Sequence, residues 1–457
     1  MGLIVRKNLL KGAMLLRLRL LGLMILIAGS FCAWQAVAMA QGTVAAWKDF
    51  SVWKEPQNAE RVSNWVNILL VRGFQNMSGT DREELLAKTL AALKEIASDS
   101  NVILPTRYNA ILAAGQLVSK EAVPGGDPPE AYPDALPYLV DLYQQADTPH
   151  FLKYGALLGI VRHAICGIDP SARDQVIDLF LETITTEHSP GEIALTLDEA
   201  APLDPAVWDW FRQTALEGLS ALKTTGTDNN IVAKLLTVIN GKSLTLEYFC
   251  SNQEDFTSDE RKQIRRVIEL ASKAVKTLGD LDYKAATDID AEAIVDAFVA
   301  LVKAVCDVEH KMGAEPTIPM EQIVIDVKTC IQSVAWGIRC GFLTGRRGDN
   351  SLLVSLASND PATTRLNMLM SEILELSAFL DEGDKTNKPP AAAILGDDVN
   401  ATKRAFKFDL SELSAALEKS SQALAKMQRE SVNGERVNGG ENNETPVLSE
   451  QSANSLW

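Results

Sequence analysis

The chain has 457 residues, of which 60 are acidic and 44 basic, so its formal net charge at pH 7 is −16. This length exceeds the roughly 250 to 300 residues at which a single hydrophobic core stops growing, which predicts two domains. An acidic surface repels phosphate backbones, so it disfavours nucleic acid as a partner and suits cationic partners.

The first 40 residues match the pattern of a secretory signal peptide. A basic front that ends at Arg19 is followed by an uncharged run from Leu20 to Ala40. We predict export to the periplasm or the extracellular space with cleavage after Ala40, which leaves 39 basic and 60 acidic residues and a net charge of −21. The alternative is an uncleaved segment that anchors the chain in the inner membrane, because about 20 uncharged residues can span a bilayer. Only in that case do we expect a membrane contact.

Residues 41–80 carry three aromatic side chains at a spacing of three, Trp47, Phe50 and Trp53. We interpret this region as an N-terminal cap, because the end of a stacked helical array has to cover its apolar face. A ligand platform is the alternative interpretation of the same aromatic residues.

Two similar helical stretches follow, at residues 106–117 and 152–163, and aligning them places Arg107 on Lys153 at an offset of 46 residues. Paired-helix solenoid units have offsets of about 40 to 47 residues. The sequence therefore predicts that the two stretches stack side by side. Each of them comes after a second amphipathic helix, 81–98 in the first case and 133–146 in the second.

In the first stretch a basic residue opens the helix, and small residues and a leucine follow it: Arg107, Ala110, Ala113, Ala114, Gly115 and Leu117. This pattern resembles the inner helix of a HEAT repeat. The second stretch departs in part, with Lys153 in place of Arg107 and with its glycine, Gly159, earlier in the helix. The resemblance covers roughly residues 81–187, and it implies an α-solenoid in which small residues let inner helices approach closely. The alternative is a coincidental likeness between two Ala-rich amphipathic helices.

Apolar periodicity predicts further helices beyond this pair. One helix begins at Pro170, and others are expected at 205–223 and 231–239. We assign residues 81–256 to the HEAT-like helical repeats.

A second helical block is predicted at residues 257–381. Thr257 and Glu260 form a capping box that begins its first helix, and Gly279 is expected to end that helix. Four amphipathic helices with mostly short connections can close one core as a bundle. Further solenoid units would show the same periodicity, so both arrangements stay open.

The C-terminal part begins with a predicted linker at residues 382–408, which contains consecutive prolines. Residues 409–430 form an amphipathic helix with coiled-coil spacing, which either docks on the bundle or pairs with another chain. Residues 431–457 are rich in Asn, Gly, Glu and Ser and are predicted to be disordered. The predicted fold class is therefore all-α, a HEAT-like helical-repeat solenoid followed by a helical bundle and a disordered C-terminal tail.

Five cysteines remain after the predicted cleavage, an odd number without a Cys-x-x-Cys pair. A disulfide framework would use an even set in a small domain, so we interpret them as small buried hydrophobic residues. A bridge from Cys306 to Cys330 or Cys340 is the alternative in an oxidising compartment. The five are Cys166, Cys250, Cys306, Cys330 and Cys340.

The motifs that carry chemistry are incomplete in this sequence. Gly241-Lys242-Ser243 ends like a phosphate-binding loop, but Leu236 stands where that loop needs a glycine. Asp288 and Asp290 begin like a calcium loop, but Ala293 replaces its turn glycine. Histidines are few and scattered. We therefore predict no catalytic residues, no cofactor and no metal.

The function predicted from the sequence is that of an exported, non-catalytic interaction scaffold that binds a peptide or protein on a helical-repeat surface. Arg107 and Lys153 are the candidate residues at the rim of that surface. The alternative is an envelope enzyme, or an accessory subunit of one, with a site between the two helical blocks. A cleft that gathers His163 or His310 with two or more carboxylates would favour this alternative.

Overall fold

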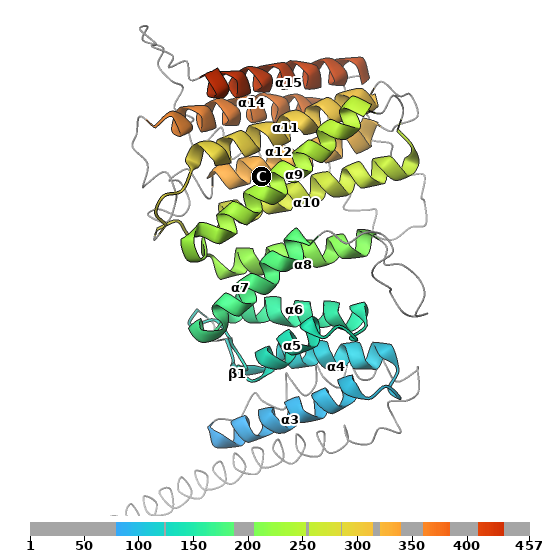
Figure 1. Ribbon diagram of the computed structural model, residues 1–457, viewed down its shortest axis with the longest axis vertical. Coiled ribbons are helices and arrows are strands. Elements are labelled where there is room, and N and C mark those ends of the chain that lie inside the picture. The colour runs from blue at the N-terminus through green and yellow to red at the C-terminus, as the bar shows by residue number, and fades with distance from the viewer. Residues whose placement is uncertain are drawn as a thin grey trace, which may run out of the picture. The chain divides into compact units, whose positions relative to one another are not determined.

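The computed structural model describes residues 79–122, 125–186, 205–252, 256–284, 286–313, 320–339, 360–383 and 410–433 (Figure 1). These ranges contain twelve α-helices, one short 3-10 helix and a single two-stranded sheet, so the predicted all-α class is confirmed. The predicted signal peptide, linker and most of the N-terminal cap and C-terminal tail lie outside the described residues. No helix within the described ranges combines the length and the apolar composition needed to cross a membrane.

The described helices belong to two compact units. Unit 1 contains α3 to α6 and the sheet, and unit 2 contains α8 to α15. The division falls between Arg173 and Asp174, inside α7 (Pro170–Thr185). The boundary predicted near residue 256 comes from the repeat pattern in the sequence, whereas the two units are defined by contacts between residues. The extent of the HEAT-like array therefore stays a prediction.

In unit 1, α3 packs on α4, and both α4 and α5 pack on α6 (Figure 1). The antiparallel pair of short strands, which the helical periodicity did not predict, comes between α4 and α5. The elements are α3 (Thr80–Ser98), α4 (Leu104–Gln116), β1 (Val118–Lys120), β2 (Glu130–Ala131), α5 (Ala135–Gln144) and α6 (His150–Cys166).

The two similar stretches form α4 and α6, which lie against each other. Their backbones meet at Gly115 and Gly159, where a Cβ atom added to Gly115 would lie 2.5 Å from the Cα atom of Gly159. Ala110 and Ala156 are both buried in the same pair of helices. Small residues therefore set the distance between these helices, as packing at interior density requires. The identity of the array as HEAT repeats remains a resemblance.

Unit 2 is built around α11, which packs against α9, α10, α12, α14 and α15. Helix α9 is longer than predicted, because it continues through Gly241 to a second buried set that includes Leu246 and Phe249. The elements are α8 (Pro205–Leu222), the 3-10 helix (Thr227–Asn229), α9 (Asn230–Asn252), α10 (Ser258–Asp280), α11 (Ala291–Gly313), α12 (Met320–Gly337), α14 (Pro361–Gly383) and α15 (Leu410–Asn433).

The start of α10 has the predicted capping box, with the Thr257 hydroxyl and the Glu260 carboxylate each accepting from the backbone N–H of the other residue. The predicted end of this helix at Gly279 is wrong, since α10 continues to Asp280. Gly279 instead allows α10 to approach α12, because an added Cβ atom there would lie 2.6 Å from the Cα atom of Gly337.

Helix α15 docks on α11 and α14 of its own chain, which is one of the two arrangements that its spacing allowed. Its apolar stripe is buried, at Leu413, Leu417, Leu424 and Met427. Ser421 donates a hydrogen bond to the Asp307 carboxylate of α11, so the buried edge of the helix also has a polar contact.

Candidate functional site

The predicted rim residue Arg107 is half-buried at the start of α4. Its Nε atom donates a hydrogen bond of 2.7 Å to the carbonyl oxygen of Ala97 in the last turn of α3. Burial lowers the pKa of Arg107 below its usual value. The side chain thus satisfies a carbonyl that a helix end leaves without an intrahelical partner. This contact joins α3 to α4 within one helix pair.

The second predicted rim residue, Lys153, is half-buried in the first turn of α6. Burial lowers its pKa, and the nearby Asp147 carboxylate opposes that shift. Arg107 and Lys153 hold corresponding places at the starts of two helices that pack together. Their contact with a partner stays a prediction.

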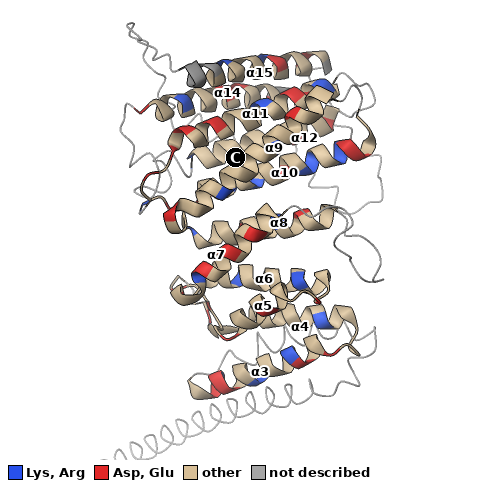
Figure 2. Cartoon of the chain, in the orientation of Figure 1, with Lys and Arg blue, Asp and Glu red and all other residues tan. Residues whose placement is uncertain are grey.

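A pocket of about 580 Å³ lies beside α3 in unit 1, and we call it the α3 pocket. This volume is within the range of about 300 to 1,000 Å³ that is usual for ligand sites. Leu86, which is almost fully buried, supplies part of its apolar lining. Acidic residues gather near the N-terminal end of α3 in Figure 2. The α3 pocket is lined by Gly79, Arg82, Glu83, Glu84, Leu86, Ala87, Ser119, Tyr132, Pro133 and Asp134.

Tyr132 joins the strand side of the α3 pocket to α5. Its backbone N–H donates to the Leu117 carbonyl at 2.8 Å, and its hydroxyl donates to the Asp134 carboxylate at 2.9 Å. Burial and the negative charges of Asp134 and Glu83 raise the pKa of Tyr132 to about 12. The hydroxyl therefore keeps its proton at neutral pH and holds Asp134 at the pocket wall.

Among the described residues that line the pocket, Arg82 is the one basic residue, and it is only 8% exposed. Its Nη2 atom donates to the Val118 carbonyl at 3.0 Å and to the Glu121 carboxylate at 3.1 Å. These contacts connect α3 to β1, and they place the Arg82 guanidinium beside the Glu121 carboxylate. Glu83 and Asp134 therefore leave the α3 pocket with an excess of negative charge.

This arrangement suits a cation that is attached to an aliphatic stem. The carboxylates of Glu83 and Asp134 can accept hydrogen bonds from an ammonium or guanidinium group, and the apolar parts of Leu86 and Tyr132 can cover the stem. Sequence reasoning missed the pocket, because it joins one face of α3 to a strand pair and a turn. The Tyr132-Pro133-Asp134 run before α5 was the available signal.

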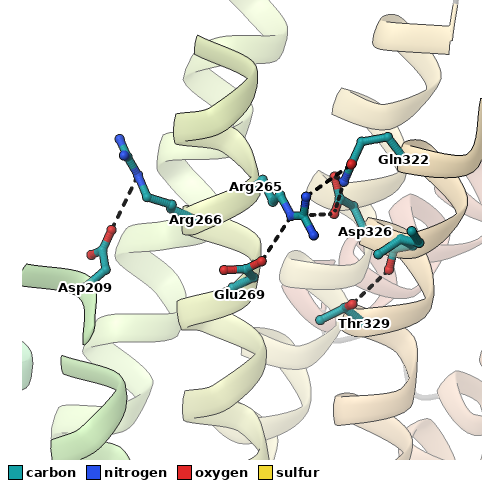
Figure 3. A network of polar contacts seen from close by, with 8 residues as sticks. Asp209, Arg265, Arg266, Glu269, Gln322, Asp326 and Thr329 are labelled. Atoms are coloured by element: carbon teal, nitrogen blue, oxygen red, sulfur yellow. Dashed lines mark hydrogen bonds and ion pairs between the residues drawn. The ribbon is translucent and has the colours of Figure 1, made fainter. Parts of the chain in front are cut away.

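Unit 2 contains a second polar arrangement, which joins α10 to α12 (Figure 3). Gln322 donates to both carboxylate oxygens of Asp326 at 2.9 Å. Arg265 lies 3.6 Å from the same carboxylate and also pairs with Glu269 at 3.1 Å. The Asp326 side chain is 6% exposed, and its burial raises its pKa to about 6 despite the opposing effects of Gln322 and Arg265.

The cysteines that the structure describes, Cys166, Cys250, Cys306 and Cys330, are all free, and only Cys250 is partly exposed. Cys306 on α11 and Cys330 on α12 are near enough for electrostatic interaction. Burial raises the pKa of both thiols, that of Cys330 to about 12. Since the thiolate is the reactive form, these two groups are chemically inert in the folded protein.

The two candidate histidines lie in different units. His163 on α6 is 2% exposed and belongs to the core of unit 1. His310 on α11 is within 2.8 Å of the Ser414 hydroxyl of α15 in unit 2. Among the described side chains, no group of three or more His, Cys, Asp or Glu residues is placed to hold a metal ion.

Comparisons with known proteins give no family for this chain: no family model matches it, and no curated protein or solved structure matches it either.

Proposed function

We propose that the protein is an exported, non-catalytic interaction scaffold in which unit 1 binds a basic segment of a peptide or protein. The observation that carries this proposal is the α3 pocket, where Glu83 and Asp134 stand beside an apolar lining. A lysine or arginine side chain of the partner would place its charge between the two carboxylates. Stacked helix pairs would supply the extended surface for the rest of the partner.

Electrostatics in this pocket favours selectivity more than affinity. An ion pair that stays in contact with water contributes only about 0.2 to 1 kcal/mol, and Glu83 is exposed. Like charges on a partner are rejected, and a basic partner approaches faster because the chain has a net negative charge. The remaining affinity has to come from apolar and backbone contacts along the helices.

The test is a selection of random peptides displayed on phage against the immobilised full chain. We expect the selected peptides to contain Lys or Arg, and we expect the double variant Glu83→Gln/Asp134→Asn to bind them about tenfold more weakly. The amide at position 134 can still accept from Tyr132, so the pocket should keep its shape. Thermal unfolding of the variant checks this.

An acidic chain attracts basic peptides non-specifically, so the control removes the same charge elsewhere. The double variant Glu95→Gln/Asp141→Asn loses two exposed carboxylates of unit 1 that lie outside the pocket. It should bind the selected peptides as the original chain does. Equal weakening in both double variants, or the absence of any selected peptide, would contradict the proposal.

A further inference from the structure

Glu309 on α11 is a carboxyl group in the core of unit 2. The residue is 0% exposed, and no described residue makes a hydrogen bond with either of its side-chain oxygens. A buried polar group in this situation destabilises the folded state, and a buried ionised carboxylate destabilises it considerably more. The protonated form is therefore the one that the folded core accepts.

Glu309 and Cys306 on α11 each interact with a titratable residue of α12. Glu309 interacts electrostatically with Asp326, and Cys306 interacts with Cys330. Asp326 has Gln322 and Arg265 to stabilise its charge, whereas no described residue supplies such a partner to Glu309. When the pair of carboxyl groups holds a single proton, that proton belongs on Glu309.

Other helices that pack around α11 bring few charges to this point. Arg265 and Glu269 of α10 act on Asp326, and Glu372 of α14 acts on Cys306. Helix α15 contacts His310 and Asp307 on α11 through Ser414 and Ser421, and the Cys250 carbonyl of α9 accepts from Lys311. Burial and the Asp326 carboxylate are the causes that raise the pKa of Glu309 well above its usual value.

We propose that Glu309 is a buried proton-binding site that makes the packing of α11 against α12 sensitive to pH. While Glu309 is protonated, the two helices stay packed. When it loses its proton, a negative charge appears in the core, where Glu309 already interacts electrostatically with the Asp326 carboxylate, and α12 loosens from α11. Glu309 lies in unit 2 and the α3 pocket lies in unit 1, so this proposal does not depend on the proposed binding function.

The direction of the effect follows from proton linkage. The unfolded or opened chain releases the Glu309 proton near its ordinary pKa of about 4.5, whereas the packed form keeps it to a higher pH. Ionisation of Glu309 therefore costs no stability below that ordinary value, and it destabilises the packed form progressively as the pH rises. One linked proton changes the opening equilibrium up to about tenfold per pH unit.

Amide hydrogen exchange followed by mass spectrometry tests the proposal on the full chain. After correction for base-catalysed exchange, opening of α11 and α12 should increase up to about tenfold per pH unit as the pH rises above 5. Glu309→Gln removes the titratable proton, so above about pH 7, where Asp326 is already ionised, its α11 and α12 exchange should be flat, and at pH 8 it should be slower than in the original chain. Glu309→Leu, which also removes the polar atoms, provides a second variant should the glutamine fail to pack.

Asp326→Asn removes the neighbouring charge. If the two carboxylates repel each other as proposed, α11 and α12 should loosen at a higher pH in this variant, whereas an unchanged pH of loosening would contradict the repulsion. We expect the higher value. Glu95→Gln, an exposed glutamate of α3, is the control and should leave the response of α11 and α12 unchanged. An unchanged pH response in both Glu309 variants would overturn the proposal.

Discussion

His163 and Glu309 are buried titratable side chains that change the stability of the fold with pH in opposite directions. Burial lowers the pKa of His163 to about 4, and the nearby Arg162 charge adds to that shift. Burial raises the pKa of Glu309, so the neutral form is favoured in both cases. Unit 1 therefore loses stability in acid through His163, whereas unit 2 loses stability toward alkaline pH through Glu309.

The effect of His163 can be measured by replacement with leucine. In the unfolded chain the imidazole gains its proton near pH 6.5, whereas in the folded chain it does so only near pH 4. The neutral imidazole therefore costs no stability above pH 6.5. As the pH falls from 6.5 to 4, unit 1 loses about 3 kcal/mol of its free energy of unfolding, because each unit of difference in pKa corresponds to about 1.36 kcal/mol. His163→Leu should remove most of this acid-dependent loss, measured as amide exchange of α4 and α6 between pH 7 and 4.

The control for that measurement is His310→Gln in unit 2. It should leave the acid response of α4 and α6 as it is in the original chain. If His163→Leu retained the full loss of protection in acid, the histidine would not be its source.

At the scale of the helices, each unit contains a pair of helices whose backbones approach closely at two glycines. Gly115 meets Gly159 where α4 crosses α6, and Gly279 meets Gly337 where α10 crosses α12. A Cβ atom added to Gly115 or Gly279 would enter the backbone of the other helix, which has no rotamer with which to move away. The distance between the helices of each pair therefore depends on the absence of a Cβ atom at Gly115 and at Gly279.

Gly115→Ala should destabilise unit 1 by about 1 to 3 kcal/mol, because the new methyl group forces α4 away from α6. The free energy of unfolding of unit 1 in urea measures the change. Gly241→Ala provides the matched control, since nothing lies within 4 Å of the added Cβ atom on α9. There the better helix propensity of alanine should stabilise unit 2 by up to about 1 kcal/mol. Destabilisation of similar size in both variants would contradict the role of the glycine contact.

At the scale of the whole molecule, the acidic net charge is compatible with a soluble exported protein that attracts basic partners. The export proposal rests on residues 1–40, whose pattern predicts a mature chain that starts at Gln41. N-terminal sequencing of the protein recovered from the producing cell is the measurement. A first residue at Gln41 in the exported fraction supports cleavage, and recovery of the intact N-terminus from the membrane fraction supports the anchor instead.

The sequence by itself determined most of the helical segments of the described chain, although α9 runs further than its apolar spacing predicted. Apolar spacing at the helical period and local signals such as Thr257 with Glu260 act within one turn, so they do not depend on the rest of the molecule. The offset between Arg107 and Lys153 likewise predicted that α4 and α6 are neighbours, and these two helices are in contact.

Only the tertiary structure decided what the polar residues do. A glutamate such as Glu309 in an amphipathic helix has the same local pattern whether it faces water or another helix, and its burial depends on how α12 packs on α11. Gly279 has the pattern of a helix end, but it is required for the approach of Gly337 from a distant segment. The α3 pocket joins residues that are far apart in sequence, from Arg82 to Asp134. Contacts of this kind are set by packing between elements, and local periodicity carries no information about them.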